Sequence, residues 1–569
     1  MKAFLSSRWF HPLLLLLWIA IGTGLRLTQL AAKPPWTDEF CTIVFSLGNS
    51  FRTVPLDQAI SLDVLLQPLQ PNPDAEITDV VQHLLTESNH PPLYFVLAHW
   101  WMQLWPPNPT GLASVWAARA LPALFGGISI PAIYGLGWLA FRSRLVGQMA
   151  AAMMAVSPYG IFLAQEARHY TLAILWVIAS LSCLVIATRH IHNQTPLPTW
   201  VGVSWVGVNF LGVSTHYFFS LTLFAEVLWL IVLGWRQRRG QGESLSSNPR
   251  IPVSPWWQIS VVAFGTLVGC LVWLLVFRQG SNGGELTNWI ESGDRGFLAW
   301  ISPVFQVLAV WISILSLLPV EAPSLPVVIA SGLVMLGFFC WAMPVLSRGI
   351  IIQLKHPTTG LITQLFVVVV VGAIALFFFF TYALGIDLTR GARYNFVYFP
   401  AMSVLIGAIL AVVWQTPPSR QKRYSLAGKK AVALIWLMGL ISGLTVVCNL
   451  GYHKYYRPEL LVPVIQRVSQ SPVLIATTHK THVQTGEMMG LAREFKLSGS
   501  PINPLFLLAH QAANPNTSTV ALQETLNQLS RPRDVWLVNF HAPVELKGCT
   551  AEPRSRSFVY GYKYELYHC

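Results

Sequence analysis

Two adjacent carboxylates, Asp38 and Glu39, follow the first hydrophobic segment of the chain. That segment runs from about Pro12 to Ala32, which is long enough to cross a bilayer, so both acids are expected at a membrane–water boundary. A carboxylate there can act as a general base that takes the proton from an acceptor hydroxyl. Two acids that follow a helix and simply face water are the plainer explanation. The polar clusters further along the chain weaken it.

A motif with a double proline places His90 and Tyr94 at the start of a short apolar segment. The prolines suit the first turn of a helix, where a missing N–H costs nothing. His90 would then lie near a helix N-terminus, where an anion is favoured. An ordinary helix start with an exposed histidine explains the motif equally well.

The densest polar cluster is the segment 165–170, which reads Gln-Glu-Ala-Arg-His-Tyr and follows a Ser-Pro pair. If the segment is helical, Glu166 shares a face with His169 and Tyr170, at spacings of three and four residues. Five polar side chains in six residues between two apolar segments are hard to explain by packing. We therefore expect Glu166 as a third acid of the site, and Arg168, His169 and Tyr170 as substrate contacts.

Arginine, histidine and tyrosine residues also occur at two later turns, and one arginine lies in the first apolar segment. Arginine can hold phosphate oxygens through paired hydrogen bonds, or it can extend to the membrane interface. Arg26 lies inside the first segment, where a charge costs roughly 3 kcal/mol and needs a partner or a polar cavity. The three acids are its candidate partners, and a structural ion pair explains it as well as a substrate contact does. The residues added to the candidate binding set are Arg26, His216, Tyr217, Arg390, Arg393 and Tyr394.

Carboxylates and cations gathered at one membrane face suit the transfer of a sugar from a lipid phosphate. A carboxylate would serve as the base, and the cations would stabilise the phosphate leaving group. A divalent metal such as Mg²⁺ or Mn²⁺, held by the acids, is another way to stabilise it. The polyprenyl tail of such a donor would lie in the bilayer, which places the site at the boundary.

Composition indicates a polytopic membrane protein. The chain has 569 residues, of which 53% are hydrophobic and only 11% charged. Its net charge of +13 comes mainly from Lys and Arg in short loops between apolar runs. That pattern indicates how the chain is oriented in the membrane and where it contacts membrane lipids, and it does not indicate binding to nucleic acid.

Apolar segments predict about eleven membrane-spanning helices, with an uncleaved signal anchor as the first. Five groups of basic residues fall in the cytoplasm if the N-terminus is cytoplasmic. This threading requires that segments 90–105 and 297–320 begin and end on the outer side; if both cross, the helices number thirteen. The segments are 12–32, 116–141, 145–164, 170–188, 198–214, 217–235, 256–277, 323–346, 361–384, 396–415 and 430–450.

The composition changes after about Gly451. Residues 1–451 form the transmembrane domain, which includes an outer loop at 33–89 with juxtamembrane helices. Residues 452–569 lack a spanning run and alternate strand-like with helical pieces, which predicts a small α/β domain on the outer face. Cys549 and Cys569 either form a disulfide there or remain two thiols.

The order and spacing of these motifs over about residues 8–450 resemble glycosyltransferase family 39. This family contains the bacterial relatives of protein O-mannosyltransferases and of the lipid A aminoarabinose transferase, with the C-type glycosyltransferase fold. The resemblance implies an inverting transferase that uses a polyprenyl-phosphate sugar, with Asp38 in the catalytic acidic position. Two positions depart from the pattern: His90 stands where many relatives have lysine, and Glu166 where many have aspartate.

Two other functions also remain compatible with the sequence. A transporter or flippase of lipid-linked sugars is the rival from another class, although it predicts inverted repeats and helices broken near the midplane. An oligosaccharide ligase or polymerase is the nearest enzymatic alternative. The expected location is the inner membrane of a bacterial cell, and the acceptor is a lipid, a glycan or a protein.

Overall fold

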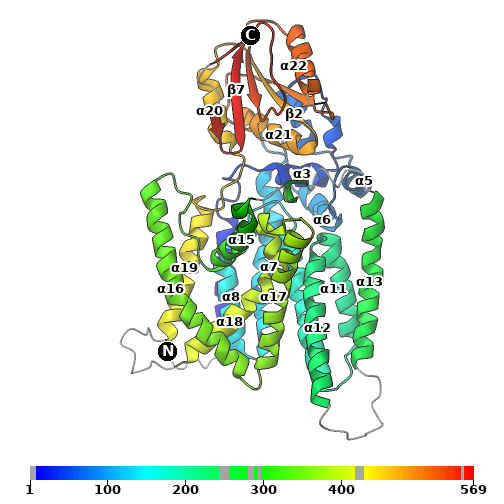
Figure 1. Ribbon diagram of the computed structural model, residues 1–569, viewed down its shortest axis with the longest axis vertical. Helices are drawn as coiled ribbons and strands as arrows, with labels where there is room; N and C mark the ends of the chain where they lie inside the picture. Colours follow the sequence, from blue (N-terminus) through cyan, green and yellow to red (C-terminus); the bar gives the residue numbers. More distant parts are fainter. Residues whose placement is uncertain are drawn as a thin grey trace.

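The protein consists of a bundle of apolar helices with a smaller sheet-containing part on one end of the bundle (Figure 1). The computed structural model describes residues 8–241, 255–279, 288–291, 296–416, 428–514, 516–552 and 557–569. We call the end of the bundle that meets the sheet the site face, defined by residues 33–36, 165–169 and 384–398.

The expected polytopic helical membrane protein is confirmed, because each of the eleven apolar segments contains a helix. Within the described ranges, nine helices are long and apolar enough to cross a membrane, or ten if the bent pair α8–α9 counts as one span. α11 and α18 reach 17 residues each. The helices of the bundle, including the shorter ones, are α2 (Phe10–Leu27), α7 (Val115–Phe141), α8 (Arg144–Val156), α9 (Pro158–Ala164), α10 (Tyr170–His192), α11 (Thr199–Thr215), α12 (Phe219–Gln241), α13 (Pro255–Gln279), α15 (Phe297–Leu315), α16 (Leu325–Lys355), α17 (Gly360–Ala383), α18 (Phe399–Gln415) and α19 (Gly428–Val447).

Two helices that the threading keeps on one side do lie along the site face. α6 (Leu93–Met102) has only ten residues, and half of them are buried. α15 is long enough to span, yet Gln306 in its middle accepts a hydrogen bond from Thr389 of the site face, and both of its ends contact neighbouring elements. The carbonyl of Trp300, near its start, accepts a hydrogen bond from Tyr382 at the end of α17. The carbonyl of Ile314, near its end, accepts one from Ser157 at the break between α8 and α9.

Basic residues gather at the opposite end of the bundle. Arg189 at the end of α10 donates a hydrogen bond to the carbonyl of Ala140 at the end of α7. Arg236 near the end of α12 reaches Gln364 near the start of α17. The start of α2 also lies at this end, where the carbonyl of His11 accepts a hydrogen bond from Gln148 near the start of α8, whereas the C-terminus lies at the top of the sheet (Figure 1). The fifth expected basic group, at 420–423, falls outside the described residues.

The sheet has seven strands in the order β1-β3-β2-β4-β7-β5, with β6 paired to β7. Its centre is parallel: β2 (Val473–His479) pairs with β3 (Leu505–His510) on one side and with β4 (Asp534–Val538) on the other. Helices α21 (His482–Leu497) and α22 (Asn516–Gln528) connect these strands, which explains why β2 is buried along nearly its whole length. The remaining strands are β5 (Thr550–Ala551), β6 (Ser557–Val559) and β7 (Tyr562–His568).

The outer loop that follows the first helix is built into this sheet. β1 (Ala59–Ser61) pairs antiparallel with β3, although nearly 450 residues separate them. Helices α3 (Thr37–Ser46), α4 (Leu62–Leu66), α5 (Ile77–Glu87) and α6 fill the layer between the bundle and the sheet. One hydrophobic core contains Phe40 and Val44 of α3 together with Met488 and Leu491 of α21. α3 is therefore enclosed between the two parts of the protein.

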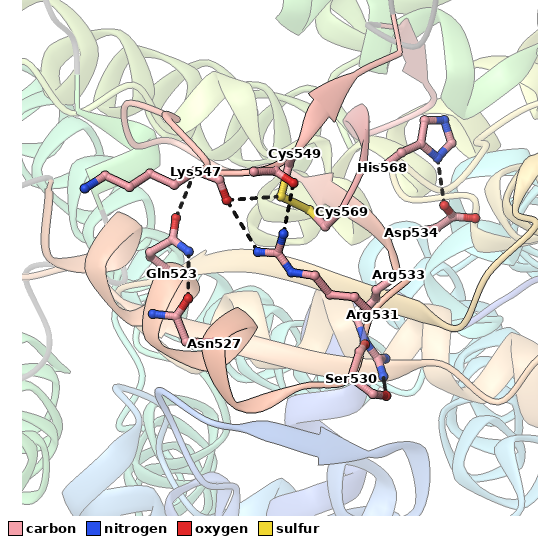
Figure 2. The surroundings of a disulfide bond; sticks show 11 residues. Gln523, Asn527, Ser530, Arg531, Arg533, Asp534, Lys547, Cys549, His568 and Cys569 are labelled. Carbon is pink, nitrogen blue, oxygen red and sulfur yellow. Dashed lines mark hydrogen bonds and ion pairs between the residues drawn. A yellow bond between two sulfur atoms is a disulfide. The ribbon is translucent and has the colours of Figure 1, made fainter.

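The end of the chain is fastened by a disulfide between Cys549 and Cys569 (Figure 2). Sequence reasoning had left the pairing open. The guanidinium of Arg531 donates to the carbonyls of Gly548 and Lys547 beside it, and His568 pairs with Asp534 at 2.8 Å. Disulfides form and persist in oxidising compartments and are rare in the cytosol.

The arrangement predicts opposite accessibility for two exposed asparagines, Asn72 in the outer loop next to the sheet and Asn193 at the basic end. Each would be changed to Cys in a background without the five free cysteines. A membrane-impermeant maleimide applied to intact cells should label position 72, whereas position 193 should need permeabilised cells. Labelling of position 193 in intact cells would contradict the orientation that the basic loops indicate.

Candidate active site

The two adjacent acids lie in the first turn of α3, where they interact favourably with the helix dipole. Adjacent side chains on a helix point about 100° apart, so Asp38 and Glu39 cannot face the same space. Glu39 is fully buried, and the Asp38 side chain keeps 28% of its surface exposed. The structure thus separates the two acids into different surroundings.

Glu39 forms a two-pronged ion pair with Arg119 of α7, at 2.7 Å to Nε and 2.8 Å to Nη2. Its Oε1 also accepts a hydrogen bond from the backbone N–H of Ala167. Burial alone would raise the pKa of Glu39, but the charges of Arg119 and Lys454 outweigh it and lower that pKa to about 2. Glu39 is therefore a fixed carboxylate that holds the site together and has no lone pair directed at a substrate.

Asp38 lies between two arginines from distant parts of the chain. Its Oδ2 is 3.4 Å from Nη2 of Arg393 and 3.8 Å from Nη2 of Arg168. Within the described ranges, no hydrogen bond reaches Oδ1. Asp38 is thus a partly exposed carboxylate with one oxygen available, which is what a general base requires.

The rings of Trp36, Trp289 and Tyr394 surround the guanidinium of Arg393, with centroids 4.8 to 5.4 Å from its Cζ. Arg393 belongs to the 3-10 helix η5 (Ala392–Val397). The hydroxyl of Tyr159 fixes η5 by donating towards the carbonyls of Ala392 and Arg393. These contacts hold the cation of Arg393 next to Asp38.

His90 is a neutral acceptor in this structure. Its Nε2 is 2.9 Å from Nη2 of Arg168, and because a guanidinium only donates, Nε2 must carry the lone pair. The proton then lies on Nδ1 and points to Ser88 Oγ at 3.0 Å. Burial and the charge of Arg168 hold the pKa of His90 well below its usual value. His90 therefore orients Arg168 rather than supplying a positive charge of its own.

The segment 165–169 is not helical, contrary to the spacing argument for Glu166. α9 ends at Ala164, and α10 begins only at Tyr170. The N–H of Ala167, which a helix would use internally, donates to Glu39 instead. Consequently Glu166 and Arg168 point to different partners, Lys454 and Asp38 respectively.

Lys454 was not predicted from the sequence. It follows the last span, and its buried ammonium contacts Glu166 and lies 3.5 Å from Oε2 of Glu39. Its Nζ is also 5.7 Å from the centroid of the Trp36 ring. The only sequence signal was one lysine in the aromatic run 452–456.

Arg26 has a different partner from the acids that we expected. Its guanidinium donates to the carbonyls of Gly22, Met154 and Ala155. The last two belong to the end of α8, whose carbonyls lose their helical partners because the helix breaks at Ser157–Pro158. The favourable placement of a cation at a helix C-terminus therefore explains this buried arginine.

Several other predicted residues form a cluster of rings around His169, the neighbour of Arg168. His169 is fully buried, and its ring centroid lies 5.4 Å from that of His90 and 4.6 Å from that of His216. Tyr94 and Tyr170 pack against the same His169 ring. Two predicted residues lie elsewhere. Tyr217 packs on Trp273, and Arg390 binds the carbonyl of Trp289 and the carboxylate of Asp387.

A metal centre does not fit the donors that the described residues present. No group of three or more His, Cys, Asp or Glu gathers in them. Asp38, Glu39 and Glu166 are each already paired with Arg or Lys. Adding a divalent cation would require breaking these pairs, so we derive no step through a metal.

Among known proteins, similarity to this chain was found only with solved structures. No protein-family model and no curated protein sequence matches the chain. ArnT from Cupriavidus metallidurans bound to undecaprenyl phosphate is similar over 97% of each chain, at 11% identity and a TM-score of 0.49. The same protein in the apo state has 12% identity over 92% of each chain and a TM-score of 0.47.

The archaeal oligosaccharyltransferase AglB from Archaeoglobus fulgidus, in complex with an inhibitory peptide and a dolichol-phosphate, is also similar. It has 12% identity over 94% of this chain and 70% of that chain, and a TM-score of 0.43. All three TM-scores are below 0.5.

Replacing Glu39 by Gln should destabilise the protein far more than replacing its neighbour Asp38 by Asn. Glu39→Gln leaves Arg119 buried without a counter-charge, which typically costs about 3–5 kcal/mol. The stabilisation from Glu39 is present above about pH 4.5 and is lost as the pH falls towards 2.

Unfolding temperatures of the purified variants in detergent, measured against pH, check both points. Equal unfolding temperatures for Glu39→Gln and Asp38→Asn would refute the structural role of Glu39.

Proposed function

We propose that the protein is an integral membrane glycosyltransferase that moves a sugar from a polyprenyl-phosphate donor to an acceptor hydroxyl. The observation that carries this proposal is the placement of Asp38. It is a carboxylate with one available oxygen, next to Arg393 and Arg168, at the end of an apolar helix bundle. This arrangement offers a base for a hydroxyl and cations for a phosphate at the depth where a lipid-linked phosphate would lie.

The charges of the site favour an anionic ligand. Three carboxylates, Asp38, Glu39 and Glu166, face four cations that are contributed by Arg119, Arg168, Arg393 and Lys454. The surplus is one positive charge, which is what a phosphodiester donor with one negative charge would neutralise. A partly dry site strengthens that attraction.

The reaction would be a single displacement at the anomeric carbon. Asp38 takes the proton of the acceptor hydroxyl as its oxygen attacks C1 of the sugar. The bond between C1 and the phosphate oxygen breaks, and the bonding electrons stay on the phosphate, which leaves as polyprenyl phosphate. Arg393 and Arg168 stabilise the charge that develops on it. One displacement from the opposite side inverts the configuration at C1.

The orientation follows from the basic residues at the end opposite the site. Lys and Arg accumulate on cytoplasmic loops, so the site face belongs outside, on the outer surface of a bacterial inner membrane. There the acceptor would be a lipid, a glycan or a protein of the cell envelope. The tail of the donor would extend among membrane lipids.

Asp38→Asn should lower sugar transfer by at least two orders of magnitude, because general-base assistance contributes about 10²–10⁴-fold. Protein yield and unfolding temperature should stay near wild type, since Asn keeps the shape. The matched control is Asp63→Asn, an exposed carboxylate that pairs with Lys496 away from the site.

Transfer can be followed with isotope-labelled polyprenyl-phosphate sugars and purified protein. Near-normal transfer by Asp38→Asn would place the base elsewhere.

Arg393→Ala should weaken use of the donor, because its phosphate would lose a charged hydrogen-bond partner in a partly dry site. Arg393→Lys should restore only part of the activity, since an ammonium is a point charge and not a planar fork. Arg390→Ala serves as the control, because Arg390 binds residues 289–291 instead of Asp38. Initial rates at limiting donor distinguish these variants, and full activity of Arg393→Ala would refute the assignment.

A further inference from the structure

Lys33 is a buried cation that the site described so far does not use. It lies in the turn after α2, and its carbonyl accepts a hydrogen bond from Arg119. Only 7% of its surface is exposed. Within the described residues, no hydrogen bond or ion pair reaches its ammonium. A largely buried lysine without a partner is costly in its charged form, so its retention requires a reason.

The groups around Lys33 come from four elements, and two of them are cations. Lys454, after the last span, and Arg119 of α7 disfavour a charge on Lys33. Glu166 of the 165–169 turn and Glu321 of the loop between α15 and α16 favour it, with smaller effects. Both of these acids have other partners, since Glu166 contacts Lys454 and Glu321 accepts a hydrogen bond from the N–H of His453.

We infer that Lys33 binds a phosphate group at this site and takes up a proton when the phosphate binds. Lys33 is joined to the site through Arg119, which donates hydrogen bonds both to the Lys33 carbonyl and to the carboxylate of Glu39. Three residues further along the chain, the Trp36 ring lies beside Nζ of Lys454 and the guanidinium of Arg393. Phosphate oxygens would give the ammonium of Lys33 the partner that it lacks. The phosphate group can arrive on a lipid or free in water, and the chemistry at Lys33 is the same.

The charge of the ligand explains why a lysine that changes its charge is useful here. Burial, together with Lys454 and Arg119, lowers the pKa of Lys33 to about 7 in the empty site. With Lys33 neutral, the surplus is one positive charge, which matches a phosphodiester. With Lys33 protonated, the surplus is two positive charges. This matches the polyprenyl phosphate that leaves, because a phosphate monoester carries a charge of about −1.5 to −2 at pH 7. This part of the inference rests on the proposed function.

Proton uptake can be measured directly by calorimetry of the full-length protein in detergent at pH 8, in two buffers of different ionisation enthalpy. The probes are undecaprenyl phosphate, neutral undecaprenol and inorganic phosphate. Wild type should take up about 0.9 proton per phosphate group, because a lysine with a pKa of about 7 is mostly neutral at pH 8. Undecaprenol should cause no uptake.

Two variants separate charge from structure. Lys33→Arg should bind phosphate without proton uptake, because arginine is already charged. Lys33→Gln should also take up no proton and should bind at least about tenfold more weakly, while its unfolding temperature stays at or above that of wild type. Lys496→Gln, at a distant surface pair with Asp63, should behave as wild type. Wild-type affinity should fall by up to about tenfold per pH unit above pH 7, and that of Lys33→Arg should not.

Each outcome decides between the sources or against the inference. Uptake with undecaprenyl phosphate assigns the site to a lipid phosphate, and uptake with inorganic phosphate alone assigns it to a soluble one. Undecaprenyl phosphate binding with the same proton count in wild type and Lys33→Arg would overturn the role of Lys33 and leave the proposed function intact. If neither phosphate binds, the inference and the proposed donor both fail.

Discussion

The buried ion pair between Glu39 and Arg119 is the interaction on which the site depends. Arg119 places its guanidinium between both oxygens of Glu39 and the carbonyls of Leu30 and Lys33. One side chain of α7 thereby fixes the turn after the first helix and the start of α3. Because Glu39 points inward to Arg119, its neighbour Asp38 must point away, to the space beside Arg393. The cost of burying these charges is offset only because every oxygen of Glu39 has a donor.

The sheet-containing part belongs to the same construction. α21 packs on α3 in a shared core, and β1 from the first outer loop completes the sheet. Lys454 contributes its ammonium from the connection between the last helix and the sheet. The acids Glu39 and Glu166 are therefore neutralised by Arg119 and Lys454, which come from distant parts of the chain. A site assembled in this way requires the two parts to be docked before it can bind an anion.

Sequence reasoning found the spans because length and hydropathy are local properties that a bilayer imposes on each segment. It selected Asp38, Arg168 and Arg393, which lie together in the structure, because acids and arginines at the ends of apolar segments are conspicuous. It could not find partners that depend on tertiary contacts. The carbonyls that bind Arg26 become available only because α8 breaks at Pro158. The expected helix at 165–170 gives way to a hydrogen bond from Ala167 to Glu39. Lys33 and Lys454 carry no motif, and their importance lies in what surrounds them.

The central claim is that the carboxylate of Asp38 is the general base when the protein transfers a sugar from a lipid phosphate at the outer membrane face. Mass spectrometry of lipid-linked sugars and envelope glycans tests it most directly, in cells that carry the wild-type gene, the Asp38→Asn gene or no gene. The account predicts that the last two strains share one defect: a polyprenyl-phosphate sugar accumulates, and the same sugar is missing from one envelope component. Unchanged lipid-linked sugars and glycans in the strain without the gene would contradict the account.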